Sequence, residues 1–288
     1  MQLPLVTVII PSYNHQNFVQ DSIRSIIQQS YQNIELLVID DGSSDQSIEK
    51  IKEMVEQCEE RFVRFEFRYR QNKGLCYTLN EALEWAQGRY FSPFASDDIA
   101  LPEKISFLVD RIENSNFPAV FGRSADTQGA IKARSLQVEV VHDFTSLIQH
   151  KNMPDTPTAL ISTAAIREVG GYAEDVKLED WYLWLKLTEN GRVLKTYPQV
   201  LALYRRHDAN ITNNISLLHA ERKKVIDKFR HSGFYSVAKD ILPLMAARHA
   251  EGYDKKLALK YLKEYGLLRP RAWPTIIKIF KKRQRAIG

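Results

Sequence analysis

The sequence has few cysteines, the residues that stabilise many small or secreted proteins through disulfides or bound zinc. Its 288 residues include only two cysteines, Cys58 and Cys76, and these lie in no CxxC or other metal-ligand spacing. We therefore expect neither a disulfide framework nor a zinc site, and the low cysteine content favours a reducing, cytoplasmic setting. With 44% hydrophobic and 26% charged residues, the chain has the composition of a globular protein that buries a core without such links.

Long apolar runs and leader-like features are also missing. No run approaches the roughly 20 apolar residues that a membrane-spanning helix needs. The opening MQLPLVTVII has neither a charged n-region nor a cleavage site. We expect it to form a first strand and not a signal peptide.

The glycine-rich loops that commonly cradle phosphates are absent, since the chain contains no GxxxxGK[ST] and no GxGxxG. What it does contain is an alternation of apolar runs and amphipathic stretches. Residues 5–10 and 34–39 are nearly continuous aliphatic runs, typical of strands buried on both faces of a parallel sheet. Residues 19–27 and 48–58 place apolar side chains at helical spacing.

Two further strands are predicted at residues 64–69 and 89–94, with another helical stretch between them. Strands that alternate with helices over the first 120 residues predict an α/β fold, with a mostly parallel, twisted, Rossmann-like sheet flanked by helices. Residues 123–157 are mixed, and we expect them to be rich in loops. The pattern is helical from about residue 215 onward, so we expect an α/β domain over residues 1–214 and a helical C-terminal region over residues 215–288.

Polar residues follow three of the predicted strands. They are Pro11, Ser12, Tyr13 and Asn14 after the first, Asp40 and Asp41 after the second, and Ser96, Asp97 and Asp98 after the fourth. Ligands of open parallel sheets bind beyond the carboxyl ends of the strands, so these residues are expected to share one edge. Carboxylates gathered there repel one another unless a positive charge offsets them. A divalent cation with oxygen ligands, Mg²⁺ or Mn²⁺, is the natural candidate, because such ions bridge to substrate phosphates.

Each of these segments also has a purely structural interpretation. Asp-Asp-Gly after a strand is a common turn, and Asp45 could cap the following helix. Residues 96–98 could be a polar loop before a helix that begins at Pro102. It is their occurrence at successive strand ends that favours a binding site.

Taken as a set, the motifs resemble those of family 2 glycosyltransferases, which have the GT-A fold. The run VTVIIPSYNHQNFVQDSIRSIIQQSYQNIELLVIDDGSSDQS is similar to that family's opening almost throughout. Asn72-Lys73-Gly74 resembles its middle section, and SDDIALPEKI resembles its metal-binding segment. GGY at residues 170–172 and EDWYLWLKL at residues 179–187 resemble its acceptor-side segment, and YRRH at residues 204–207 its closing motif. The resemblance covers roughly residues 4–214.

The resemblance implies an inverting, metal-dependent enzyme that moves a sugar from a nucleotide-diphosphate donor, with a UDP-sugar favoured, to an acceptor hydroxyl. Its nucleotide-binding residues would be Pro11, Ser12, Tyr13, Asn14, Asp40, Asp41, Asn72, Lys73, Gly74, Ser96 and Asp97. Asp98 would hold Mn²⁺ or Mg²⁺, and His207 could add a further metal or phosphate contact. Asp180 would be the general base, because a carboxylate can take the proton of a weakly nucleophilic sugar hydroxyl. Glu179 is the competing base.

The sequence also departs from the family pattern and leaves several roles open. Many relatives have Asp-x-Asp-Asp at the metal segment, whereas the first of those positions is Ala95 here. His207 could equally be an ordinary surface histidine, and Arg205 and Arg206 could face a diphosphate or the solvent. Acidic residues also suit the start of a helix, which is the structural interpretation of residues 179–180.

The partners implied by the sequence are a nucleotide-diphosphate sugar and a glycan or lipid-linked glycan acceptor, as in bacterial surface polysaccharide synthesis. The C-terminal PTIIKIFKKRQR, residues 274–285, could form a basic amphipathic helix at the inner face of the cell membrane, or it could be a solubilising tail. No aromatic residues interleave those charges, so nucleic acid is not an expected partner.

Two other function classes fit parts of the pattern. A nucleotidyltransferase would have a basic, glycine-rich loop after the first strand, and PSYNHQN at residues 11–17 lacks one. A non-catalytic nucleotide-sugar-binding protein of the same fold is the second alternative. Ala95 favours that alternative, whereas the presence of both Asp98 and Asp180 disfavours it.

Overall fold

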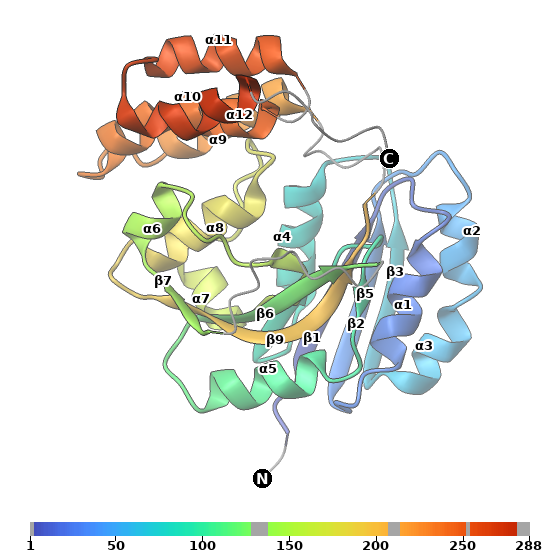
Figure 1. Ribbon diagram of the computed structural model, residues 1–288. Helices are drawn as coiled ribbons and strands as arrows, with labels where there is room; N and C mark the ends of the chain where they lie inside the picture. Colours follow the sequence, from blue (N-terminus) through green and yellow to red (C-terminus); the bar gives the residue numbers. More distant parts are fainter. Residues whose placement is uncertain (1–2, 128–137, 207–213, 252–253, 281–288) are drawn as a thin grey trace, which may run out of the picture. The chain divides into compact units, whose positions relative to one another are not determined.

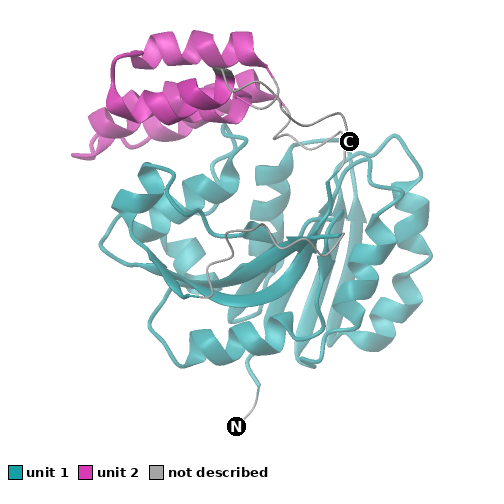
Figure 2. Ribbon diagram, in the orientation of Figure 1, with its two compact units in different colours: residues 1–206 teal, residues 207–288 magenta. Residues whose placement is uncertain are grey.

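The computed structural model describes residues 3–127, 138–206, 214–251 and 254–280 (Figure 1). The chain forms two compact units, Met1–Arg206 and His207–Gly288 (Figure 2). The assignment of a catalytic domain to residues 1–214 stays a prediction. Among the helices of the described residues, none combines the length and the apolarity needed to cross a lipid bilayer.

The first unit is built on one sheet. Its strands, in the described part of the chain, are β1 (Val6–Ser12), β2 (Ile34–Asp40), β3 (Arg64–Tyr69), β4 (Tyr90–Pro93), β5 (Ile99–Ala100), β6 (Ala119–Asp126), β7 (Val140–His142), β8 (Leu160–Ser162) and β9 (Leu194–Tyr204). The sheet order is β3-β2-β1-β4-β8-β6-β9-β5, and β7 pairs with β9. The helices of this unit are α1 (Val19–Ile27), α2 (Ser47–Lys52), α3 (Val55–Arg61), α4 (Leu75–Trp85), α5 (Lys104–Glu113), α6 (Phe144–Ile148), α7 (Thr163–Glu168) and α8 (Glu179–Thr188).

The predicted α/β fold is confirmed. The sequence indicated the parallel strands β1 to β4 most clearly. Strands β3, β2, β1 and β4 are parallel neighbours, whereas β8 runs antiparallel to both β4 and β6. Every residue of β2 is buried, as expected for a strand covered on both faces. Helices α1, α3 and α5 contribute to the hydrophobic cluster on one face of β1 and β2, and α4 packs against β1 from the other side (Figure 1).

A buried carboxylate joins the parallel strands at the end away from the candidate ligand edge. Glu35 in β2 is fully buried and accepts hydrogen bonds from the Thr7 hydroxyl (2.5 Å) and from the backbone N–H groups of Gln87 (2.7 Å) and Gly88 (2.9 Å). It also pairs with Arg64 of β3 at 3.0 Å. Donors from three segments therefore satisfy one charge, which is the condition under which a buried carboxylate is tolerated.

The second unit is helical, as the sequence predicted. It consists, over its described residues, of α9 (Ile215–Asp227), α10 (Tyr235–Ala250), α11 (Lys255–Tyr265), the 3₁₀ turn η3 (Pro270–Ala272) and α12 (Trp273–Phe280). Its own hydrophobic core brings together residues of these helices, among them Leu244, Leu262 and Ile279.

Candidate functional site

The polar residues that follow β1, β2 and β4 lie at one edge of the sheet. Ser12 at the end of β1 pairs in register with Asp40 at the end of β2, and Ile9 of β1 pairs with Pro93 of β4. These strands are parallel, so the loops that follow them leave the sheet on the same side. The structure thus brings together the strand-end residues that the sequence singled out.

The loops after β1 and β2 are tied to each other by hydrogen bonds. The Asn14 N–H donates to Ser43 Oγ (2.8 Å), and Asn14 Oδ1 accepts from the Ser44 N–H (2.8 Å). Asn14 adopts a positive φ of 54°, a conformation that asparagine tolerates better than most residues. Tyr13 next to it is 50% exposed, whereas Ser12 is buried. The paired loops therefore form one surface on which the Tyr13 ring is accessible to a ligand.

Asp40 and Asp41 have different surroundings. The Asp40 carboxylate is buried and accepts hydrogen bonds from the Ser43 N–H (2.8 Å) and hydroxyl (2.6 Å), so it holds the turn around Gly42. Gly42 has a φ of +83°, and a Cβ there would lie 2.6 Å from the backbone nitrogen of Asn72. The turn therefore requires glycine both for its conformation and for the close approach of residues 70–72.

Asp41 binds the segment that contains Asn72, Lys73 and Gly74. Its carboxylate accepts hydrogen bonds from the Lys73 N–H (2.9 Å) and the Gly74 N–H (2.8 Å), and it forms an ion pair with Arg70. Arg70 is a site residue that sequence reasoning missed. Its position just after a half-exposed strand offers a weak signal, but its pairing with Asp41 depends on the fold.

Asp97 and Asp98 are both buried beside the same edge. Burial, and secondly the charge of Asp97, raise the pKa of Asp98 to about 7, although the Arg205 N–H donates to its Oδ1 at 2.9 Å. Two adjacent buried carboxylates are an unfavourable arrangement that a divalent cation would relieve. Their oxygen donors suit Mg²⁺ or Mn²⁺, which typically take one or two carboxylates and complete their shell with water and substrate phosphates.

In the described ranges there is no group of three or more His, Cys, Asp or Glu residues that could hold a metal ion. His207, the other predicted ligand, lies outside the described residues. A metal at Asp97 and Asp98 could complete its shell with water and with the oxygens of a bound diphosphate.

Lys104 is a second residue that the sequence did not reveal. It is fully buried at the start of α5, where its Nζ donates to Ser92 Oγ (2.7 Å) and lies 4.8 Å from the centroid of the Phe94 ring. Burial lowers its pKa to about 7, against the opposing influence of Asp98. An ammonium group near Asp98 partly offsets the charge that the carboxylate would carry.

Three further residues of the sequence motifs, Ser96, Arg205 and Arg206, have different surroundings. Ser96 is buried and its hydroxyl lies 2.7 Å from Nδ1 of His15, so it also connects two of the loops. The Arg205 side chain pairs with Asp21 of α1 at 3.1 Å and covers the Phe18 ring, whereas Arg206 is exposed. The guanidinium group of Arg205 is thus held against α1, and its backbone is held against Asp98.

Glu179 and Asp180 form the first turn of α8. Asp180 Oδ2 accepts a hydrogen bond from the Thr156 hydroxyl (2.7 Å), and its Oδ1 accepts from the Trp181 N–H (2.6 Å). Burial, and secondly the charge of Asp180, raise the pKa of Glu179 well above its usual range. The two carboxyl groups therefore differ: Asp180 is oriented by donors, and Glu179 favours its protonated form at neutral pH.

The first turn of α4 contacts Asp41 and the segment just before α8. Gly74, its N-cap residue, donates to Asp41, and Cys76 donates from Sγ to the Val176 carbonyl at 3.2 Å. Burial, and then the charges of Glu179 and other nearby acids, raise the pKa of the Cys76 thiol to about 12. Gly74 thus contacts Asp41, and Cys76, two residues later, lies close enough to Glu179 for the charge of that residue to affect its pKa.

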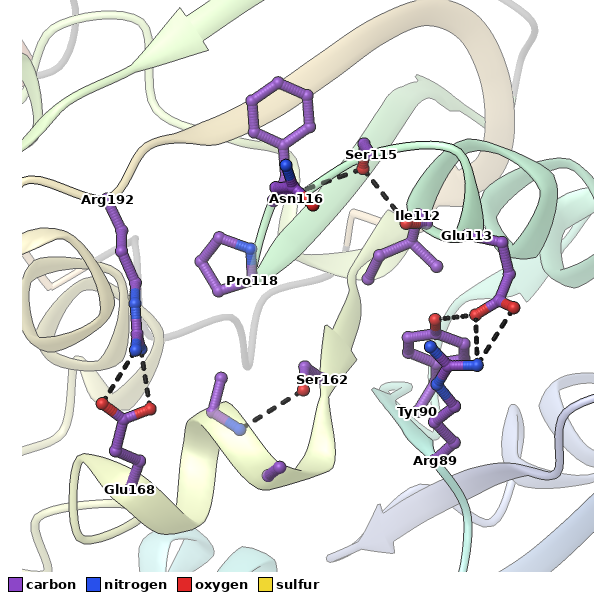
Figure 3. A pocket seen from close by; sticks show the side chains of 13 residues that line it. Arg89, Tyr90, Ile112, Glu113, Ser115, Asn116, Pro118, Ser162, Glu168 and Arg192 are labelled. Atoms are coloured by element: carbon purple, nitrogen blue, oxygen red, sulfur yellow. Dashed lines mark hydrogen bonds and ion pairs between the residues drawn. The ribbon is translucent and has the colours of Figure 1, made fainter.

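An open pocket of about 350 Å³ lies elsewhere on the first unit, where β4 begins and α5 ends (Figure 3). Two ion pairs lie along it, Arg89 with Glu113 and Arg192 with Glu168. It contains none of the residues that the sequence placed in the site.

The family model described as "Glycosyl transferase family 2" matches residues 7–169, which include the loops after β1 and β2 and the Asp97–Asp98 pair. The chain belongs to glycosyltransferase family 2. This transferase is 27% identical over 219 residues to TuaG of Bacillus subtilis (strain 168), named as a candidate glycosyltransferase of teichuronic acid biosynthesis; the match covers 73% of this chain and 82% of TuaG.

Solved structures show that the transferase has the GT-A fold. It superimposes with a TM-score of 0.67 on the mannosyltransferase PcManGT from Pyrobaculum calidifontis, in complex with GDP-Man and Mn²⁺, at 17% identity, covering 95% of this chain and 79% of that one. It superimposes equally, with a TM-score of 0.67 and 15% identity, on residues 1–349 of S. aureus TarS in complex with UDP-GlcNAc, covering 96% and 79%. At these identities the likeness concerns the fold, and the ligands are those of the other proteins.

Proposed function

We propose that this transferase moves a sugar from a nucleotide-diphosphate donor, with UDP-sugars favoured, to a glycan or lipid-linked acceptor hydroxyl, with inversion at the anomeric carbon. The observation that carries the proposal is the placement of two groups of carboxylates, at residues 40–41 and 97–98 on one sheet edge and at residues 179–180 on α8. The first turn of α4 contacts both Asp41 and Val176, which comes just before α8. One group suits a donor with its metal, and the other suits deprotonation of an acceptor.

On the donor side, the exposed Tyr13 ring offers a surface on which a base can stack, and Asp41 can accept from the base or ribose. Pro11, Ser12, Asn14 and residues 72–74 shape the loops around them. Asp98, with Asp97 beside it, would hold Mn²⁺ or Mg²⁺ against the diphosphate. The metal, when bound, stabilises the negative charge that develops on the leaving diphosphate.

On the acceptor side, Asp180 takes the proton of the attacking hydroxyl. Its carboxylate is already oriented by the Thr156 hydroxyl and the Trp181 N–H, as a base in a positioned pair is expected to be. Glu179 favours its protonated form, which makes it the weaker candidate for the base. The hydroxyl oxygen then attacks the anomeric carbon from the face opposite the leaving diphosphate, which gives inversion.

Thr156→Val is expected to lower kcat about tenfold or more while leaving the KM for the donor nearly unchanged. The substitution keeps the side-chain shape but removes a hydrogen bond to a charged group, which contributes about 1.5–3 kcal/mol. Thr156→Ser restores the hydroxyl and should restore the rate. If Thr156→Val retains full kcat, Thr156 does not position the base.

Titration calorimetry of the full chain with UDP tests the donor site, first with Mn²⁺ and then with excess EDTA. We expect UDP to bind with Mn²⁺ and to lose most of its affinity in EDTA, because the diphosphate completes the metal shell. Binding that is unaffected by EDTA would contradict the metal-dependent site. If UDP does not bind in either condition, GDP, CDP and dTDP test the choice of nucleotide.

The setting proposed for the reaction is the cytoplasmic side of a cell membrane, in the synthesis of a bacterial surface polysaccharide. The likeness to TuaG supports a polysaccharide role. The basic residues of the predicted tail lie at 281–285, outside the described residues, so its predicted membrane contact stays a proposal.

The alternative is a non-catalytic nucleotide-sugar-binding protein, which Ala95 at the metal segment favours. Retained UDP affinity without transfer from any nucleotide-sugar donor would support it. The hydrogen-bonded Asp180 favours catalysis, since a binding protein has no need of an oriented base.

A further inference from the structure

The second unit exposes apolar side chains within a short stretch. Leu268 is 92% exposed, Trp273 58% and Ile277 53%. Leu267 beside them is 40% exposed. Single exposed apolar residues are ordinary, but four of this size within eleven residues of sequence call for an explanation.

The helix that carries two of these residues has two apolar sides. Thr275 and Ile279 on one side of α12 are buried, at 1% and 2% exposure, so that side meets the rest of the unit. Trp273 and Ile277 are four residues apart and therefore lie next to each other on the opposite side. The fold of the unit needs only the first side, and the second remains available to a partner.

The charge of the same stretch has one sign. Residues 267–280 contain Arg269, Arg271 and Lys278 and no acidic residue. Arg269 pairs with Asp240, and Lys278 pairs with Glu251 at 2.7 Å, but their side chains stay 48% and 66% exposed. In the sequence, Lys281, Lys282, Arg283 and Arg285 follow directly. A partner for this patch must therefore be apolar and must also attract cations.

We propose that the surface formed by residues 267–278, the apolar–basic surface, docks on an anionic lipid bilayer. Leu268, Trp273 and Ile277 would enter the boundary between head groups and acyl chains, while Arg269, Arg271 and Lys278 contact lipid phosphates. Tryptophan is favoured at that boundary because its ring is apolar and its N–H is polar. Apolar burial and attraction to anionic lipid add together in such surfaces.

The apolar–basic surface extends beyond the predicted basic tail, because residues 267–273 precede that tail and include Leu268, the most exposed of these apolar side chains. It also stands separately from the proposed reaction. A variant that cannot dock should still transfer sugar to a water-soluble acceptor, and a variant that cannot transfer sugar should still dock.

Vesicle sedimentation of the full chain tests the surface directly. Vesicles of phosphatidylcholine are compared with vesicles in which part of that lipid is replaced by phosphatidylglycerol. We expect binding to the anionic vesicles that weakens as salt is added, and much weaker binding to phosphatidylcholine alone. The triple variant Leu268→Ser, Trp273→Ser, Ile277→Ser should bind the anionic vesicles at least about tenfold more weakly.

A matched variant controls for the loss of exposed apolar area in general. Val63→Ser, Val141→Ser changes two residues of the first unit that are 60% and 52% exposed, and it should bind vesicles as the unmodified chain does. Thermal unfolding of both variants shows whether each still folds. Equal binding by the triple variant and the control would overturn the proposal. So would concentration-dependent self-association that the triple substitution abolishes in the absence of vesicle binding, because the surface would then join two copies of the chain.

Tryptophan fluorescence gives a second readout that does not depend on the triple variant. Trp85, Trp181 and Trp184 are buried, at 8%, 2% and 1% exposure, so a shift to shorter wavelength on adding vesicles would come from Trp273. Trp273→Phe should keep most of the binding and lose the shift. Sedimentation with no shift would contradict insertion of this surface.

Discussion

Asp180→Asn is expected to lower kcat by roughly 10²- to 10⁴-fold, the contribution of a positioned general base. The amide keeps the shape of the carboxylate: its oxygen can still accept from the Trp181 N–H, and its NH2 group can donate to the Thr156 hydroxyl, so the fold around α8 should be retained. It cannot take a proton from the acceptor. The measurement is steady-state transfer from the nucleotide sugar identified by calorimetry, together with UDP affinity in Mn²⁺, which should stay within a fewfold of its original value.

Glu179→Gln is the matched comparison for this experiment, since it changes the neighbouring carboxyl group in the same way. The pKa of Glu179 is raised by burial, so the side chain is mostly neutral near pH 7 and glutamine is its close mimic. We expect a far smaller loss of kcat than with Asp180→Asn. A reversed order of the two losses would identify Glu179 as the base.

Asp98→Asn is expected to remove the Mn²⁺-dependent part of UDP binding and, with it, nearly all transfer. The amide oxygen can still accept from the Arg205 N–H, but it no longer offers the metal a charged ligand. Calorimetry with and without EDTA should then give the same weak affinity. Asp110→Asn, at an exposed position of α5, is the control and should bind as the unmodified chain does. Retained metal dependence in Asp98→Asn would contradict the assignment of Asp98.

The same variant should leave the metal-free protein at least as stable at pH 8 as the unmodified chain. The folded-state pKa of Asp98, about 7, lies above its unfolded value of about 3.9, so ionising this carboxyl costs folding stability as the pH rises between those values. Asparagine avoids that cost. Thermal unfolding in EDTA should therefore show that the advantage of Asp98→Asn at pH 8 disappears near pH 4. Loss of binding by this variant then reflects the site and not unfolding.

The sequence was most informative where local pattern determines structure. Buried parallel strands have continuous apolar runs, so β1 and β2 and the polar residues at their ends could be located in advance. The two residues of β5 and the three of β8 carry no such pattern, because strands this short are defined by their pairing partners. They could be found only from the folded chain.

The parts of the site that escaped prediction depend on contacts between distant residues. Arg70 reaches Asp41 across 29 positions, and Thr156 reaches Asp180 across 24. Lys104 looks like a polar residue at a helix start, and nothing nearby in the sequence shows that it is fully buried. Tertiary packing determines these three placements, and the local pattern around each residue does not encode it.

The buried Glu35 also bears on how the chain reaches this structure. Its hydrogen-bond donors come from β1, β3 and the turn before β4, so all of these segments must arrive correctly before the charge is satisfied. If β1 slipped by one residue against β2, Thr7 would turn to the other face and leave the carboxylate partly unpaired. Glu35 therefore favours the correct strand register, because a misassembled sheet would bury a carboxylate that lacks some of its partners and would be less stable than the correct sheet.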